Sequence, residues 1–239
     1  MAAVVNKRFY GAMGLSIAAL VFAGFARTYY LREWFDVPPI TMLLHLHGLA
    51  FTAWVVLFVV QTRLVAAHNY RMHMKLGIAG VVVAACVVIL GFATAVVSAG
   101  APRMRPMGLT SPQFSLIPLV AITSFAILVS AAIFFRRRPE FHKRLMTLAM
   151  IAVIAPPTAR LIALTTSGTH FLAIQTLMTA VLVILCLIND WRSKRTVHPL
   201  YAIVGTFLVV SWPLRVWVAQ TPAWDRAGQW IAQLGRAYV

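Results

Sequence analysis

Apolar residues in this sequence gather into long runs that are separated by short polar segments. Each run approaches the ~20 residues that an α-helix needs to cross ~30 Å of hydrocarbon. The runs are continuous instead of alternating, which favours helices over the strands of a β-barrel. The pattern therefore predicts an all-α fold, a polytopic membrane bundle of about seven transmembrane helices. The runs cover roughly residues 10–26, 40–61, 76–100, 115–135, 145–166, 171–188 and 199–218.

The end of the sequence predicts a helix of another kind. Residues 222–239 form an amphipathic pattern, which is typical of a helix that lies on a membrane surface. The prediction is a single transmembrane domain over residues 1–239 with this tail on its outer surface. Docking onto a partner subunit is an alternative role for the tail. The positions that recur at helical spacing within it are Trp224, Gly228, Ile231, Leu234 and Tyr238.

Composition and charge agree with a membrane location and indicate an orientation. Hydrophobic residues make up 61% of the chain and charged residues only 11%, against about a quarter charged in a soluble domain. The net charge of +16 does not indicate nucleic acid, because the basic residues lie in short loops beside lipid headgroups. Thirteen Lys and Arg residues fall on the side of the N-terminus and seven on the other. This bias predicts a bacterial inner-membrane protein with a cytoplasmic N-terminus and a periplasmic or extracellular C-terminus. The first run is expected to remain as a helix, with a cleaved signal peptide as the alternative.

Two short segments echo one another along the chain. "YRMHMKLG" precedes the third run and "EFHKRLM" precedes the fifth, which places His73 and His142 in matching positions. The echo predicts two related helix hairpins that pack as a four-helix core over about residues 40–166. His73 and His142 would then be neighbours near the cytoplasmic face, where they could ligate one metal or haem. Contact with lipid phosphates is the alternative.

The second run contains two histidines although it has no charged residue before position 63. His45 and His47 are two residues apart, so they point about 200° from one another on a helix. His45 lies on a stripe of small and polar residues, which predicts an interhelical hydrogen bond. His47 lies on an aromatic stripe, which makes it the better candidate for a haem ligand.

Arg160 is expected inside the fifth run, just after a break in the helix. Pro156 and Pro157 lack backbone N–H groups and should end the helix before them. Broken helices at membrane depth usually line a cavity. The sequence therefore predicts an outer polar pocket that combines Arg160 with His45 and His47, near His170. The alternative is that these histidines bond neighbouring helices and that Arg160 reaches the membrane interface.

The stretch "HLHGLAFTAWVVLFVVQTRLVAAHNYRMHMKLG" and the later "FHKRLM" resemble a pattern in uncharacterised bacterial multi-span membrane families. In that pattern, an early intramembrane His is followed by basic loops with His-x-Lys/Arg-Leu-Gly. Some of these families are linked to the assembly of haem–copper oxidases. The resemblance covers about residues 40–160, and it implies functional roles for His47, His73 and His142. The layout is also similar to that of transmembrane di-haem cytochromes, but the fourth run has no histidine for a complete two-haem set.

Motifs of several enzyme and cofactor classes are missing from the sequence. There is no C-x-x-C-H, Walker, G-x-G-x-x-G or H-E-x-x-H motif. All five carboxylates fall in loops or at the ends of runs, which argues against a carboxylate-rich metal centre and against proton-coupled transport. The predicted function is a non-catalytic accessory protein that binds haem b or a metal ion through histidines, in respiratory-complex assembly or electron transfer. A small-solute transporter or channel and a purely structural membrane partner are the alternatives.

Overall fold

The structure, a computed structural model, describes residues 2–102, 105–165 and 170–238. It is 86% helical, and no strand occurs in these ranges. Within the described residues, seven helical segments are long and apolar enough to cross a membrane, which confirms the predicted all-α polytopic bundle. In chain order the elements are α1 (Ala2–Phe25) with η1 (Ala26–Tyr30), η2 (Arg32–Trp34), α2 (Met42–Ala66), α3 (Tyr70–Gly100), η3 (Pro106–Gly108), α4 (Ser111–Phe114) with α5 (Leu116–Phe134), α6 (Pro139–Ala152) with α7 (Ala155–Thr165), α8 (Phe171–Lys194), η4 (Tyr201–Gly205) with α9 (Thr206–Ala219), and α10 (Pro222–Arg236).

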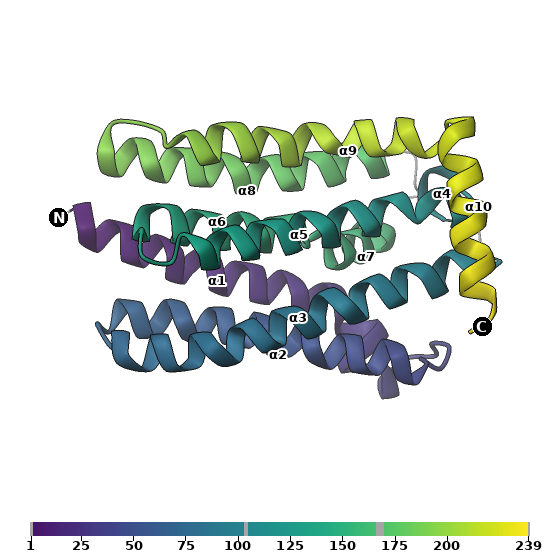
Figure 1. Cartoon of the computed structure of the whole chain (residues 1–239), viewed down its shortest axis with the longest axis horizontal. Helices are drawn as coiled ribbons and strands as arrows, with labels where there is room; N and C mark the ends of the chain where they lie inside the picture. Colours follow the sequence, from purple (N-terminus) through teal and green to yellow (C-terminus); the bar gives the residue numbers. More distant parts are fainter. Residues whose placement is uncertain (1, 103–104, 166–169, 239) are drawn as a thin grey trace.

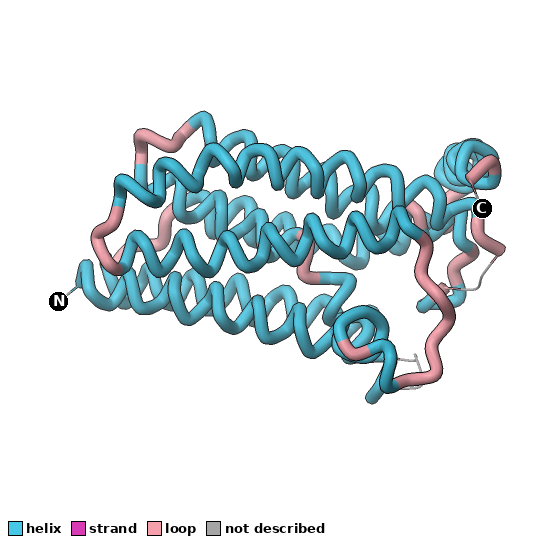
Figure 2. Tube along the Cα trace, turned by 90° about the horizontal axis from the view of Figure 1, so that it is seen from below, coloured by secondary structure: helices cyan, strands magenta, loops and turns pink. Residues whose placement is uncertain are grey.

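The spans run back and forth along one axis, so the bundle has two distinct ends (Figure 1). The N-terminal end holds the start of α1 and the connections 67–69, 135–138 and 195–200. Basic residues lie in or beside each of these connections: Arg63 and Arg71 flank the first, Arg136, Arg137 and Arg138 lie in the second, and Arg195 lies in the third. The C-terminal end holds α10, which forms as expected and crosses the ends of the spans at a steep angle (Figures 1 and 2). The basic loops used to predict orientation thus share one end of the molecule. Arg103, a basic residue counted for the other side, lies outside the described residues.

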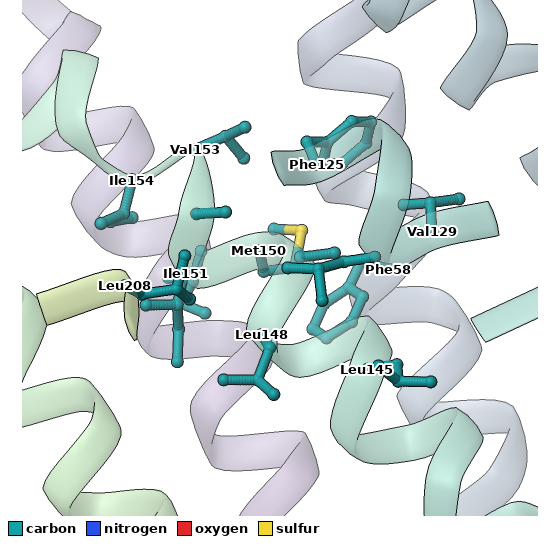
Figure 3. Packing of buried hydrophobic residues seen from close by; sticks show 14 of the residues in the cluster. Phe58, Phe125, Val129, Leu145, Leu148, Met150, Ile151, Val153, Ile154 and Leu208 are labelled. Carbon is teal, nitrogen blue, oxygen red and sulfur yellow. The ribbon is translucent and has the colours of Figure 1, made fainter. Parts of the chain in front are cut away.

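The fifth span is the centre of the bundle and is broken, as the two prolines predict. α6 ends at Ala152, and the chain turns through Val153 and Ile154 before α7 begins (Figure 3). Pro156 and Pro157 then lie in the first turn of α7, where a backbone N–H has no partner within the helix in any case. The prolines therefore start the second half of the span and do not disrupt it.

A large hydrophobic cluster surrounds most of this central span. Side chains of α6, such as Leu148 and Met150, are at most 1% exposed and pack against Phe125 of α5 and Phe58 of α2 (Figure 3). The hairpins α2–α3 and α5–α6 form, and α3 packs along α5. The expected core over residues 40–166 is part of a larger one, because α1, α8 and α9 add buried residues to the same cluster. These include Ile17, Cys186 and Leu208.

Helix α10 is held against the bundle by close contacts at glycines. A Cβ atom at Gly228 would lie only 2.6 Å from the carbonyl oxygen of Pro112 in α4. Gly235 lies even closer to the backbone of α3 at Val96, where a side chain would overlap the carbonyl. Only glycine allows two backbones to approach so closely. The opposite face of α10 exposes Trp230, which is 62% exposed and suits a membrane–water interface.

Candidate functional site

A cavity of about 680 Å³ opens at the N-terminal end of the bundle. α2, α3, α5 and α6 form most of its wall, while α1 contributes Tyr10 and α8 contributes Lys194. Its lining is mainly aromatic and aliphatic, and Gly77 and Gly80 keep side chains off the α3 wall. Most cofactor sites combine such an apolar wall with a few placed polar groups. The apolar residues that line it include Trp54, Leu57, Phe58, Val81, Val129, Ile133 and Met146.

His73 and His142 both face this cavity, so the structure brings together the pair expected from the sequence echo. His73 lies in the first turn of α3, which begins where the side chain of Asn69 accepts a hydrogen bond from the Met72 amide at 3.2 Å. His142 lies in the first turn of α6, which begins at Pro139. The two rings are 6.3 Å apart between centroids and nearly perpendicular, at 83°.

The hydrogen bonds around the two imidazoles leave ligand positions open. Nδ1 of His142 donates to the carbonyl oxygen of Ala132 at 2.9 Å, since a carbonyl only accepts. The proton therefore lies on Nδ1, and Nε2 of the neutral ring keeps its lone pair. Nδ1 of His73 is buried without a partner among the residues described, and so is Oε1 of Gln61, whose Nε2 donates to the backbone oxygen of His73 at 3.1 Å. Within the described part of the chain, the residues around the cavity thus include at least two buried polar atoms without hydrogen-bond partners, one from α2 and one from α3.

A buried ion pair stands behind the cavity, and the sequence analysis missed it. Arg144 of α6 and Asp190 of α8 are both fully buried, and their bidentate contact has distances of 2.9 and 2.7 Å. The third nitrogen of Arg144 donates to the side chain of Glu140 at 2.7 Å. Asp190 lies in the last turns of α8, at the span end where the sequence placed it, but its burial was not expected. A buried charge pair is stable only when its groups are hydrogen-bonded, and all three guanidinium nitrogens are used here.

The same network fixes the rim of the cavity. Glu140 also pairs with Lys143 at 2.7 Å and with Lys194. Asp190 accepts a hydrogen bond from the backbone amide of His198 at 3.1 Å, which ties down the connection between α8 and α9. Burial and the positive charge of Arg144 lower the pKa of His198. Glu140 and Arg144 are four residues apart on one helix, and this spacing is a signal in the sequence for the Glu140–Arg144 ion pair.

His45 and His47 lie in the other half of the bundle and point in different directions, as expected. His45 is exposed beside the ring of Tyr29, 6.0 Å away between centroids. The stripe that carries His45 packs against the first span, where the Tyr30 hydroxyl contacts that of Thr52 at 2.9 Å. His47 is half-buried on the opposite side, and its buried Nδ1 has no partner within the described part of the chain. Neither histidine lines the 680 Å³ cavity.

Arg160 does not join these histidines, so the expected outer pocket is not formed. Its guanidinium lies 4.3 Å from the centre of the Phe25 ring and donates to the Thr28 hydroxyl at 3.2 Å. Those residues belong to the end of the first span, whose next residues, Tyr29 and Tyr30, contact α2 instead. The first span therefore passes between Arg160 and α2. His170 precedes α8 as an exposed residue.

The described residues contain no group of three His, Cys, Asp or Glu side chains that could hold a metal ion. A site built from two histidines is consistent with haem, which supplies four of the iron ligands itself. The chain matches no protein-family model, no curated protein and no solved structure.

Proposed function

We propose that this membrane protein binds haem b in the cavity at its N-terminal end, where His73 and His142 would hold the iron through their ring nitrogens. The observation that carries the proposal is the pair of imidazoles, 6.3 Å apart, in an aromatic and aliphatic cavity. With metal–nitrogen bonds of about 2 Å, that separation keeps both rings within reach of one iron. Bound haem would supply one-electron transfer, and the protein would serve electron transfer in a respiratory complex or the assembly of one.

The hydrogen bond of His142 supports its role as a ligand. A metal-bound histidine usually donates its second ring N–H to a carbonyl or carboxylate, which fixes the ring and makes the ligand nitrogen more basic. The 2.9 Å contact from Nδ1 of His142 to the Ala132 carbonyl is of this kind. Nδ1 of His73 has no hydrogen-bond partner among the described residues, and this ring approaches from a different span. The two side chains would therefore hold the iron between α3 and α6.

The other residues that line the cavity suit the macrocycle and the propionates of haem. Trp54 and Phe58 give an aromatic wall for a flat macrocycle, and Gly77 and Gly80 leave space beside α3. Lys143 and Lys194 lie at the rim, where ammonium groups can pair with haem propionates. These lysines share Glu140, so a propionate would compete with a carboxylate already in the network.

Visible absorption of the detergent-purified protein, supplied with haem, tests the proposal. The wild-type protein is expected to show a Soret band and the sharp bands of a six-coordinate haem in the reduced state. His73→Ala and His142→Ala should each shift or abolish the Soret band, because each removes one axial nitrogen. His45→Ala is the matched control, since it removes an imidazole far from the cavity and should leave the spectrum unchanged.

The variant His47→Ala tests which histidines hold the haem, His73 with His142 or those in the other half of the bundle. If His47 were the ligand, as the aromatic stripe of the sequence suggests, its loss would remove the Soret band while His73→Ala and His142→Ala left it intact. That result would move the site to the other half of the bundle. A wild-type protein that acquires no Soret band from supplied haem would refute the haem proposal altogether.

We also propose that the N-terminal end faces the cytoplasm of a bacterial inner membrane. The support is the gathering at that end of Lys and Arg residues in or beside the connections 67–69, 135–138 and 195–200. A reporter that is active only outside the cytoplasm should be active when fused after Val239 and inactive when fused after Arg138. The reverse pattern would invert the orientation and place the cavity at the opposite membrane surface.

A further inference from the structure

A second group of buried polar side chains lies in the C-terminal half of the bundle, between α7, α8 and α9. It shares no residue with the histidine-lined cavity. Each member is at most 4% exposed, which is unusual for polar groups inside a membrane span. The group consists of Thr158, Gln175, Thr179, Ser211, Trp212 and Arg215.

Hydrogen bonds connect most of this group into one chain of contacts. The Thr158 hydroxyl lies 2.9 Å from Oε1 of Gln175, and the Thr179 hydroxyl donates to the Gln175 backbone oxygen at 3.1 Å. The indole nitrogen of Trp212 donates to the Thr179 hydroxyl at 3.1 Å. Arg215 places its guanidinium 5.0 Å from the centre of the Trp212 ring.

Two of these side chains keep donors without partners. Arg215 uses Nη2 for a 2.8 Å bond to the Ser211 hydroxyl, but its buried Nε and Nη1 have no hydrogen-bond partner within the described ranges. These two nitrogens carry three N–H groups. The amide nitrogen of Gln175, which is fully buried, also has none there. Both side chains therefore present unused donors inside the protein.

The unused donors lie at the same level of the bundle. α8 and α9 pack side by side and run in opposite directions (Figure 1). Starting from the Thr179–Trp212 contact, Gln175 is four residues toward the C-terminal end on α8, and Arg215 is three residues toward the same end on α9. Each step is about one helical turn, or ~5 Å.

Among the residues that the structure describes, Arg215 also has no carboxylate side chain as a counter-charge. All five carboxylates of the sequence are among the described residues, and the ion pairs use only Glu140 and Asp190. The other fully enclosed arginine, Arg144, has a carboxylate on each side. A guanidinium stays charged at any ordinary pH, and a buried charge without a partner is strongly unfavourable. The arrangement calls for an anion that is not part of the chain.

We propose that Arg215 and Gln175 bind the carboxylate of a small organic anion in the C-terminal half of the bundle. A carboxylate accepts several N–H bonds at once, which matches the guanidinium donors and the added amide. The surroundings suit an apolar body attached to it, because Trp212 and Val216 belong to a buried hydrophobic cluster with Leu116. The carboxylate could come from a free short-chain acid or from a fatty acid of the membrane.

Thermal unfolding of the purified protein in detergent tests this proposal with sodium acetate, butyrate and octanoate as probes. For the wild type, an anion at ~100 times its Kd should raise Tm by roughly 5–10 °C. Arg215→Gln should remove this rise, and without added anion it should unfold at a higher temperature than the wild type. The wild type should therefore have the lower Tm without anion and the higher Tm when the anion is saturating. A response that grows from acetate to octanoate would identify a fatty acid, and one largest for acetate a free solute.

Arg226→Gln is the matched control, because it removes an exposed positive charge at the same end and should keep the full response. Gln175→Leu retains Arg215 and should weaken the response, which keeps the test decisive if Arg215→Gln does not fold. Equal rises in Tm for the wild type and Arg215→Gln would overturn the proposal, since they would reflect a general salt effect. The proposal would also be overturned if none of the three probes raised the Tm of the wild type, or if Gln175→Leu showed the same rise as the wild type.

Discussion

Replacing Asp190 with Asn is expected to lower the free energy of unfolding by about 3–5 kcal/mol, the range for breaking a buried ion pair from one side. Asp190 and Arg144 are both fully buried and share two hydrogen bonds of 2.7 and 2.9 Å. Asparagine keeps the size of the side chain but removes its charge. Arg144 would then depend on Glu140 alone, which is partly exposed to solvent. Reversible chemical unfolding in detergent micelles, followed by circular dichroism, measures the change.

Two further variants distinguish the stability lost by breaking the ion pair from the stability lost by changing any one side chain. Arg144→Met combined with Asp190→Leu removes both charges and should recover most of the stability, because hydrophobic residues of similar size often replace a buried pair without loss. Glu140→Gln, at the rim, should cost only about 0–1 kcal/mol, as exposed ion pairs do. If Asp190→Asn cost no more than Glu140→Gln, the pair would have no special role in holding α6 to α8.

Gly24→Ala is expected to destabilise the bundle by about 3 kcal/mol, the upper part of the usual range for an overpacked site. A Cβ atom at Gly24 would lie 2.6 Å from Cα of Pro157 and would overlap the carbonyl of that residue. The obstacle is backbone at the start of α7, which cannot rotate aside as a side chain can. The first span would be pushed away from the central span, and unfolding in detergent would show the loss.

Gly11→Ala is the control on the same helix, since nothing lies within 4 Å of the position its Cβ would take. It should be neutral or gain up to ~1 kcal/mol, because alanine favours a helix over glycine. Equal effects of the two substitutions would show that Gly24 acts only through helix propensity and that α1 does not pack closely on α7.

The spans and the helix break follow from local features of the sequence, and for that reason they could be predicted. A membrane span must satisfy its own backbone hydrogen bonds over a fixed thickness, so run length alone indicates the helix. Pro156 and Pro157 remove donors from known positions, and the turn at Val153 and Ile154 lies directly before them. The nearness of His73 and His142 was also predictable, because both open a span at the same end.

The side-chain pairings depend on which helices are neighbours, and no run of residues carries that information. Arg160 was expected beside His45, but equal depth does not bring two residues together when another span passes between them. Arg215 was counted only among the seven basic residues of the outer side, and its burial inside α9 was not expected. The Arg144–Asp190 pair joins residues 46 positions apart, from two spans that each read simply as apolar.

The position of α10 has a consequence for biogenesis. This helix follows all seven spans in the chain, yet it packs through Gly235 onto the end of α3 and through Gly228 onto α4. Those spans enter the membrane long before α10 is synthesised. The end of α3 and the short helix α4 therefore remain uncovered while the ribosome completes the helices between them and α10. Docking of α10 can follow only after those helices are synthesised, and it then connects the end of the α2–α3 hairpin to the start of the α4–α5 span.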